Sequence, residues 1–378
     1  MRTDCRYSGN GTHAVGIQRR VKTMARVGVI TFLHNHNYGS SLQAYALQRV
    51  IRKMGHDCVH LDYDPDRREK VLNLIRTRNH PKLILEGLRK KQVLTDQAGA
   101  RRKRELFSAF YRDHLRLTER CRNQKELRAQ SRDREILICG SDQIWNPVWL
   151  NPAYFLTFAP KGTVKAAYAA SLGIRRRPAE EKVRQIRRWT ADFQNISVRE
   201  EEGADLLKEM TGRQADVMPD PVCLLTAEEW SGLAGPPPAG EPYLLCYFIG
   251  ENRQYWEKAE ALRKETGCRV IVLPVTAESY AEADQRHYSL MDGAGPEAFL
   301  GAVQNAALLC TDSFHGLAFA TIFGTETRVL RRYREEDPES KNSRIDHFLR
   351  RLDARPLPVQ REEGLRWLRS CLSETEKE

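Results

Sequence analysis

Short apolar segments alternate with helical segments along most of this chain, and this alternation restricts its fold more than any other feature. The apolar, strand-like segments are Val27–Phe32, Val59–Tyr63, Ile136–Gly140, Val164–Ser171, Ile196–Arg199, Tyr243–Ile249, Val270–Val275, Ala306–Cys310 and Thr327–Arg331. Segments between them carry apolar residues at helical spacing, as Leu42–Met54 does before Gly55 ends the pattern. Strands that alternate with helices form parallel sheets with right-handed crossovers. The pattern therefore predicts an α/β fold built from doubly wound, Rossmann-like sheets.

The chain has 378 residues, a length that favours two domains. The stretch Ser231–Pro242, with the sequence SGLAGPPPAGEP, is its clearest linker pattern. We therefore expect two Rossmann-like domains that face each other across a cleft. The predicted units are a disordered leader over 1–24, an N-terminal domain over 25–230, a linker over 231–242, a C-terminal domain over 243–352 and a C-terminal tail or helix over 353–378.

The positive charge of the chain is concentrated in residues 66–134. This segment holds 21 Lys/Arg against 9 Asp/Glu, a net charge of +12, whereas the whole chain carries +11. Its composition predicts a basic helical insertion in the first domain. Such a segment suits an anionic membrane surface, a diphosphate-linked substrate or nucleic acid. Its few aromatic residues (Phe107, Phe110 and Tyr111) argue against nucleic acid, since base stacking has little support.

Cysteine usage and the absence of long apolar stretches bear on location. The nine cysteines are scattered without a CxxC pair, which favours reduced thiols. No stretch has the roughly 20 apolar residues of a membrane helix, and no apolar segment follows Arg2 and Arg6 to complete a secretion signal. We expect a cytoplasmic protein. His34 and His36 lack the accompanying carboxylates of a metal site, so no metal is expected.

The segment Leu308–Gly316 combines a buried strand, a tight turn and the start of a helix. Its turn carries a carboxylate (Asp312), a hydroxyl (Ser313) and an imidazole (His315), followed by Gly316. Ligands of open α/β sheets bind outside the carboxyl ends of the strands, where helix N-termini favour anions. His315 is therefore a candidate site residue, and the plainer alternative is a structural histidine.

Three further segments place polar residues after predicted strands. Arg199 ends one strand, where its planar guanidinium suits a carboxylate or phosphate; a surface salt bridge is the simpler alternative. Asp142 follows another strand, with Trp145 as a possible sugar-stacking residue or a core residue. The loop with Asn37 and Tyr38 follows the first strand, and we interpret it as an acceptor-binding loop.

Several separated motifs together resemble the polysaccharide pyruvyl transferase family over residues 27–352. The motifs are, in order, Asn37–Gln48, Gly140–Asn146, Ser197–Glu200, Asp220–Val222, Thr311–Gly316 and Asn342–Ile345. The resemblance implies a two-domain fold like that of B-type glycosyltransferases. It also implies transfer of pyruvate from phosphoenolpyruvate to sugar hydroxyls, as a ketal, on a cell-surface polysaccharide or its lipid-linked precursor. Phosphoenolpyruvate is then a co-substrate, and no cofactor is expected.

The resemblance also suggests roles for the candidate residues. His315 and Arg199 would hold phosphoenolpyruvate, with Ser313, Gly316 and Arg344 as further donor contacts. His315 and Asp312 are the candidates for the proton donor and the base, and either residue could take either role. Some family members carry arginine where this chain has Ser313, and Arg344 is the expected substitute. The acceptor would contact Asn37, Tyr38, Asp142 and Trp145.

Two other functions fit parts of the sequence. A nucleotide-sugar glycosyltransferase would use the same fold. A nucleic-acid binder would use residues 66–134, although contact of this segment with an anionic membrane at its inner face explains the same charge.

Overall fold

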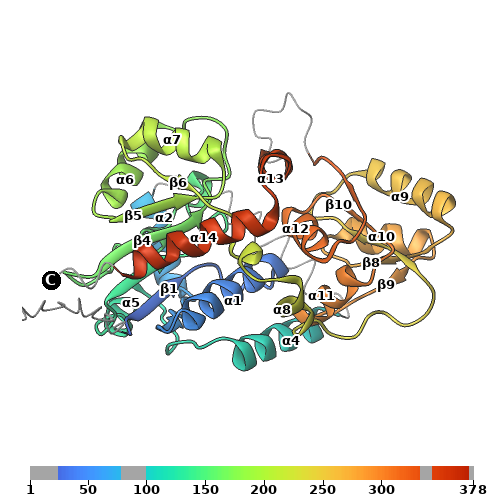
Figure 1. The fold of residues 1–378 in the computed structure, drawn as a ribbon, viewed down its shortest axis with the longest axis horizontal. Helices are drawn as coiled ribbons and strands as arrows, with labels where there is room; N and C mark the ends of the chain where they lie inside the picture. The colour runs from blue at the N-terminus through green and yellow to red at the C-terminus, as the bar shows by residue number, and fades with distance from the viewer. Residues whose placement is uncertain (1–23, 78–98, 333–342, 374–378) are drawn as a thin grey trace, which may run out of the picture.

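The computed structural model describes residues 24–77, 99–332 and 343–373. Two parallel sheets form two domains that lie side by side (Figure 1). The α/β fold class expected from the alternating pattern is confirmed. The predicted leader lies outside the described residues except for Met24, as does part of the basic insertion.

The first sheet has six parallel strands in the order β2-β1-β3-β4-β5-β6. The elements of this domain are β1 (Arg26–Ile30), α1 (Tyr38–Lys53), β2 (Asp57–His60), α2 (Arg67–Thr77), α4 (Gly99–His114), α5 (Gln124–Gln130), β3 (Ile136–Cys139), β4 (Val164–Ala170), α6 (Glu180–Thr190), β5 (Asn195–Val198), α7 (Glu201–Thr211) and β6 (Asp216–Val217). Short 3-10 helices lie at Pro147–Trp149, Pro152–Phe155 and Pro221–Leu224. The edge strand β6 has two residues, too few for a recognisable sequence pattern.

The second sheet has five parallel strands in the order β11-β10-β7-β8-β9. The remaining elements are α8 (Ala227–Ser231), β7 (Tyr243–Tyr247), α9 (Arg253–Thr266), β8 (Arg269–Val272), α10 (Ala277–Gln285), β9 (Ser289–Leu290), α11 (Pro296–Gln304), β10 (Leu308–Thr311), α12 (Phe314–Phe323), β11 (Thr327–Val329), α13 (Ser343–Ala354) and α14 (Leu357–Leu372). Gly324 ends α12 in the left-handed conformation (φ 77°), which glycine adopts without steric cost.

One hydrophobic core runs through both domains. It joins β1 and α1 of the first domain to α11 and α12 of the second, with residues such as Leu47, Phe299 and Phe319 fully buried. Inter-domain contacts within a chain are usually smaller and more polar than a domain core. We therefore expect the shared core to hold the two domains in a fixed orientation. The candidate site then lies between the loops of the two domains.

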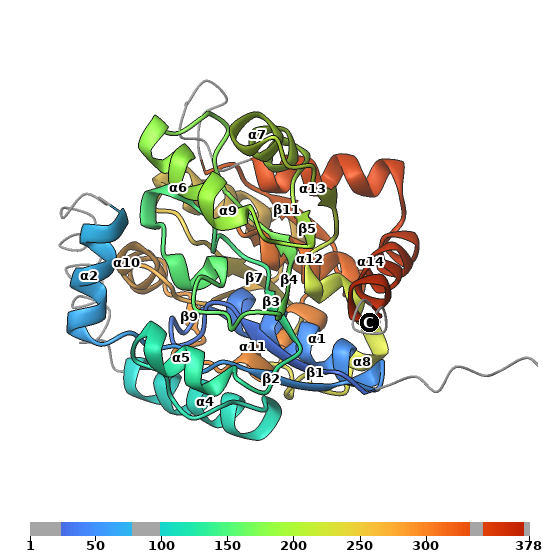
Figure 2. The same ribbon diagram turned by 90° about the vertical axis from the view of Figure 1, so that its left-hand side faces the viewer.

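The basic insertion is mainly helical where it is described, in α2, α4 and α5. These helices lie on the side of the first domain opposite α13 and α14 (Figure 2). Helix α4 extends to the second domain, where His114 contacts Glu297 at 3.1 Å and Leu106 packs against Gly295. The insertion therefore also joins the two domains.

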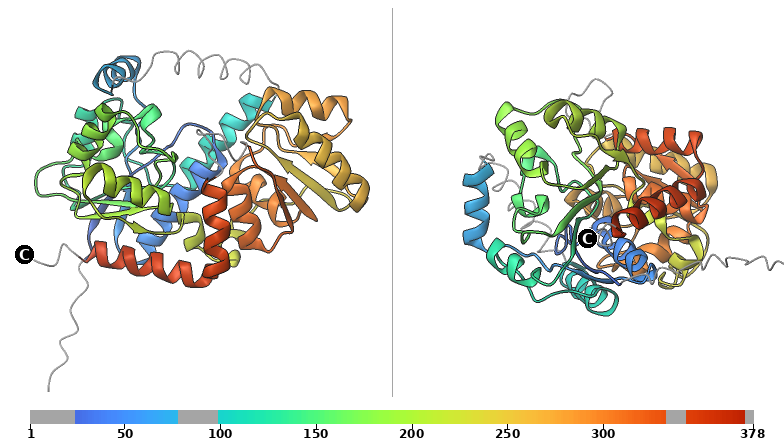
Figure 3. Two further views of the ribbon diagram at one scale, coloured as in Figure 1. Left: turned by 90° about the horizontal axis from the view of Figure 1, so that it is seen from above. Right: turned by 60° about the vertical axis from the view of Figure 1, so that its left-hand side comes forward.

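Helix α14 returns the chain to the first domain and runs along one edge of the molecule (Figure 3). It packs on the 3-10 helix Pro221–Leu224, and Arg361 donates to the carbonyl oxygens of Cys223 and Leu225. Among the described residues, every helix is too short or too polar to cross a membrane.

Gly364 allows α14 to approach the first domain closely. A Cβ atom there would lie 2.5 Å from the hydroxyl of Tyr168 and 2.6 Å from Cδ2 of Leu224. Overpacking of this kind costs about 1–3 kcal/mol, so Gly364→Ala should lower the free energy of unfolding by that amount in urea titrations. The exposed Ser370→Ala in the same helix is the control. Unchanged stability of Gly364→Ala would show that α14 is not tightly docked.

Candidate functional site

The strand orders place the candidate site at the switch points of both sheets. In the first sheet, β2 is added on one side of β1 and the later strands on the other, so the strand order reverses between β1 and β3. In the second sheet, the strand order reverses in the same way between β7 and β10. Ligands of doubly wound sheets bind at such points, outside the carboxyl ends of the strands. Here the two switch points enclose one pocket of about 260 Å³. Its lining residues are Phe32, Asn35, Asn37, Ser40, Asp142, Gln143, Trp149, Ile249, Ser313, Phe314, His315, Arg332 and Arg344.

His315 lies in the first turn of α12 and faces the first domain. Ser313 caps this helix by accepting a hydrogen bond from the backbone N–H of Gly316 at 3.2 Å. The imidazole is 7% exposed, and its Nε2 lies 3.6 Å from Oδ2 of Asp220, beyond hydrogen-bond range. Gly39 of α1 packs against the other side of the ring, where a Cβ atom would lie 1.9 Å from Nδ1. The ring is therefore held between α1 and Asp220.

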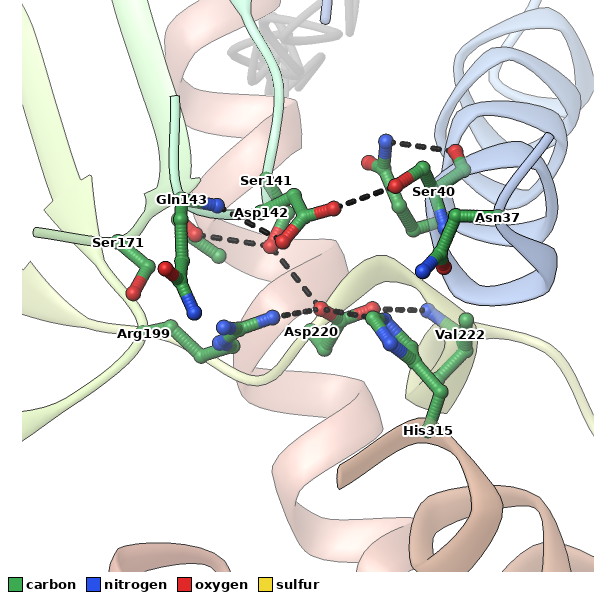
Figure 4. Close-up of polar contacts among 12 residues, drawn as sticks. Asn37, Ser40, Ser141, Asp142, Gln143, Ser171, Arg199, Asp220, Val222 and His315 are labelled. Atoms are coloured by element: carbon green, nitrogen blue, oxygen red, sulfur yellow. Dashed lines mark hydrogen bonds and ion pairs between the residues drawn. The ribbon is translucent and has the colours of Figure 1, made fainter. Parts of the chain in front are cut away.

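Asp220 is the centre of a buried polar network. It lies just before Pro221, and Arg199 and His315 reach it from opposite sides (Figure 4). Its Oδ2 accepts hydrogen bonds from Nη1 of Arg199 at 2.7 Å and from Oγ of Ser141 at 3.0 Å. Burial alone would raise the pKa of Asp220, but His315 and Arg199 lower it well below its ordinary value. Asp220 is therefore a buried anion that lies between Arg199 and His315.

Arg199 follows β5 and is 3% exposed. Its Nε donates to Glu200 at 2.9 Å, and its guanidinium carbon lies 4.4 Å from the centre of the Phe314 ring. Burial lowers the pKa of Arg199, but the charges of Glu200 and Asp220 raise it by more. The net pKa lies above its ordinary value, so the group stays charged. Its Nη2 is buried and has no hydrogen-bond partner among the described residues. A buried donor without a partner is costly, so this N–H group, beside the pocket-lining Phe314, is a candidate ligand contact.

Two more arginines extend this cationic site. Arg332 donates from Nε to Asp312 at 2.9 Å, and the same carboxylate accepts from the backbone N–H groups of Ile249 and Gly250. Loss of hydration, together with the charges of Arg199 and Arg332, lowers the pKa of Arg344 to about 10. With the amide oxygen of Gln143 turned toward it, Arg344 donates to that oxygen at 2.7 and 3.0 Å. An anionic ligand would relieve this crowding of positive charge.

The first domain contributes polar groups from the loop after β1 and from Asp142. Asn37 caps α1 by accepting from the backbone N–H of Ser40 at 3.2 Å, and the Ser40 hydroxyl donates to Asp142 at 2.6 Å. Asp142 has a φ of 76°, and His34 and His36 also have positive φ values. Left-handed backbone at residues other than glycine is costly and is concentrated at functional sites.

Not every predicted site residue faces the pocket. Trp145 is fully buried and stacks on Phe155, so the structure does not place it where a ligand could stack; the half-exposed Trp149 lines the pocket instead. Tyr38 is buried between the domains and donates to the carbonyl oxygen of Ala294. Gly316 is buried behind the capping hydroxyl of Ser313.

The Asp312 carboxylate is fully buried and bound by Arg332 and two backbone N–H groups. It therefore holds Arg332 and the turn after β7.

Arg332 and the central role of Asp220 were not predicted. Asp220 belongs to one of the family motifs, which could have indicated it, whereas Arg332 stands in no motif. No group of three or more metal-ligating side chains occurs within the described ranges.

Comparison with known proteins places this site in context. A family model described as polysaccharide pyruvyl transferase matches residues 37–332. A search of curated proteins finds no match. Among solved structures, a putative UDP-N-acetylglucosamine 2-epimerase from Listeria monocytogenes is similar at 10% identity and a TM-score of 0.52, covering 94% of this chain and 98% of that one.

Two other structures are similar at lower TM-scores. They are the UDP-GlcNAc 2-epimerase from Neisseria meningitidis (10% identity, TM-score 0.47, covering 92% of this chain and 99% of that one) and the E. coli heptosyltransferase WaaC (10% identity, TM-score 0.40, covering 86% and 99%). The likeness to the Listeria structure, together with the two parallel sheets, agrees with the expected two-domain α/β fold.

Proposed function

Because the chain belongs to the polysaccharide pyruvyl transferase family, we propose that it transfers pyruvate from phosphoenolpyruvate to sugar hydroxyls of a cell-surface polysaccharide or its lipid-linked precursor. One observation supports the donor most strongly. Arg199 holds a buried N–H group without a partner in the described structure, and it lies against Phe314, which lines the pocket together with His315, Arg332 and Arg344. Phosphoenolpyruvate carries a carboxylate and a phosphate, and it matches this concentration of positive charge.

The arginines bind the donor in this proposal. The Nη2 atom of Arg199 and the guanidinium of Arg344 contact the two anionic groups, since planar guanidinium groups suit both carboxylate and phosphate. Arg332, held by Asp312, adds a third positive charge. Asp312 thus acts as a positioning residue instead of a proton donor or base. Ser313 and Gly316 shape the N-terminal turn of α12 beside the donor.

His315 is the proposed proton donor. It transfers a proton to the methylene carbon of phosphoenolpyruvate, which becomes a methyl group and leaves an oxocarbenium-like C2. An acceptor hydroxyl attacks C2, and its proton returns to His315. The tetrahedral intermediate then loses phosphate, a second hydroxyl attacks C2, and its proton leaves with the phosphate. The products are the pyruvyl ketal and inorganic phosphate.

The acceptor contacts in this proposal come from the first domain. Asn37 and Asp142 line the donor pocket and offer hydrogen bonds to the sugar hydroxyls that enter it. No base besides His315 is assigned.

The basic insertion supports a location at a membrane surface. Arg68, Arg101 and Arg102 are exposed, and clustered cations attract anionic lipid head groups. We propose that the protein works in the cytoplasm, with this face toward the inner membrane surface.

Ligand binding and phosphate release test the donor assignment. Phosphoenolpyruvate should bind the wild-type protein in calorimetry and raise its melting temperature, while UDP-glucose and UDP-N-acetylglucosamine should not. A panel of methyl glycosides of hexoses and N-acetylhexosamines should then identify an acceptor by phosphate release. Stabilisation by a UDP-sugar without binding of phosphoenolpyruvate would instead favour the glycosyltransferase alternative.

A further inference from the structure

A second, larger pocket adjoins the donor pocket and has no role in the site described above. It measures about 520 Å³, within the range of about 300–1,000 Å³ typical of small-molecule sites. Asn35 and Asn37 line both pockets, so the two spaces are neighbours. A ligand in the second pocket would therefore lie beside the proposed donor.

Both domains contribute to this second pocket. The first domain supplies the loop after β1 and the beginning of α4, including Lys103. The second domain supplies Pro274 and Val275 after β8, Tyr280 of α10, and Asp292, whose carboxylate accepts a hydrogen bond from the Tyr280 hydroxyl at 2.7 Å. Apolar surfaces with a few placed polar groups are typical of sites that orient small ligands.

Lys103 is the distinctive residue of the second pocket. Its ammonium lies 4.6 Å from the centre of the Tyr38 ring and 5.8 Å from that of Phe107. Within the described part of the chain it makes no hydrogen bond or ion pair, whereas Arg101 and Arg112 of the same helix are paired with acidic neighbours. Burial lowers the pKa of Lys103 to about 8, against the opposing effect of Asp292. Its side chain is partly exposed in the pocket, so an ammonium without an acceptor there has hydrogen-bonding capacity left for a ligand.

We infer that the acceptor sugar binds in this second pocket, and that Lys103 holds it by donating hydrogen bonds to its hydroxyl oxygens. The inference rests on the proposed function, because it assumes that the neighbouring pocket binds the donor. Hydroxyl groups that extend past Asn35 and Asn37 would then reach the donor, while the rest of the sugar lies between α4 and α10. Lys103 is a specificity-determining residue in this account and takes no part in proton transfer.

The groups around Lys103 predict how acceptor binding depends on pH. Besides Asp292 and Tyr280 of the second domain, the first domain presents His34, His36 and Arg104 to this pocket. Burial lowers the pKa of Lys103 to about 8, so its ammonium loses its charge as the pH rises through this range. A rise in acceptor KM above about pH 8 therefore reports loss of the Lys103 charge, and it should disappear in Lys103→Arg, which stays charged.

The experiment compares Lys103→Met, Lys103→Arg and the exposed control Lys125→Met, using the methyl glycoside that supports most phosphate release. We expect Lys103→Met to raise the acceptor KM about tenfold or more, since a charge-assisted hydrogen bond is lost, with the Kd for phosphoenolpyruvate unchanged. In addition, the bound glycoside should slow acetylation of Lys103, but not of Lys125, by acetic anhydride, as measured by peptide mass spectrometry.

The two proposals fail differently in this experiment. An unchanged acceptor KM in Lys103→Met, or unchanged acetylation of Lys103 with the glycoside bound, would overturn the inference and leave the donor site intact. Absent binding of phosphoenolpyruvate to the wild-type protein, measured without acceptor, would overturn the proposed function itself.

Discussion

Replacing Arg199 with lysine is expected to lower kcat/KM for phosphoenolpyruvate by about 100-fold while the chain stays folded. Lysine keeps one positive charge for Asp220 and Glu200, but it has no counterpart of the buried Nη2. Each hydrogen bond between charged groups contributes about 1.5–3 kcal/mol, so loss of one or two gives an effect of this size. Phosphate release at varied phosphoenolpyruvate concentration measures it. The exposed Arg188→Ala should keep wild-type activity.

Arg199→Ala should also destabilise the fold, because it leaves two buried carboxylates without their partner. Breaking a buried ion pair in this way costs about 3–5 kcal/mol.

The pKa of Asp220 is lower in the folded than in the unfolded chain, so ionised Asp220 stabilises the fold above its unfolded pKa of about 3.9. That stabilisation is lost as the pH falls below this value. Wild-type activity in Arg199→Lys would contradict the donor assignment.

Gly39→Ala is expected to reduce activity about 100-fold or more with little change in the stability of α1. The added Cβ atom would lie 1.9 Å from Nδ1 and 2.2 Å from Cγ of His315, so the imidazole must move away. Alanine is favoured over glycine within a helix by about 1 kcal/mol, which offsets part of the strain. A displaced His315 loses its place beside Asp220 and the donor, and kcat for phosphate release should fall.

Gly232→Ala is the matched control for Gly39→Ala. Gly232 has a φ of −66°, and its nearest neighbours to an added Cβ atom are backbone oxygens at 3.6 Å, an ordinary contact. This variant should keep wild-type kcat. If Gly39→Ala is folded and fully active, the position of His315 between α1 and Asp220 has no part in the reaction.

Most of the fold follows from the sequence, and the ends of the strands show where the prediction stops. Predicted strands continued to Phe32, Ile249 and Val275, whereas β1, β7 and β8 end two or three residues earlier. These apolar residues line the two pockets instead of extending the sheets. An apolar run indicates burial, but it does not distinguish a hydrogen-bonded strand from a pocket wall.

The candidate site was predictable where a residue directly follows a strand. His315, Arg199 and Asp142 were predicted in this way, because parallel strands bring their carboxyl ends together. Arg332 was missed because its role depends on Asp312, a contact between separate loops that no spacing encodes. Trp145 was placed in the acceptor site because tryptophan suits both a sugar and a core, and only packing shows that it stacks on Phe155.

A crystal structure with phosphoenolpyruvate bound tests the central claim most directly. We predict that the ligand lies at the carboxyl ends of β5 and β10, with one anionic group accepting a hydrogen bond from Nη2 of Arg199 and its methylene carbon facing His315. Phosphoenolpyruvate bound away from Arg199 and His315, or a pocket that excludes it at saturating concentration, would contradict the proposed donor site.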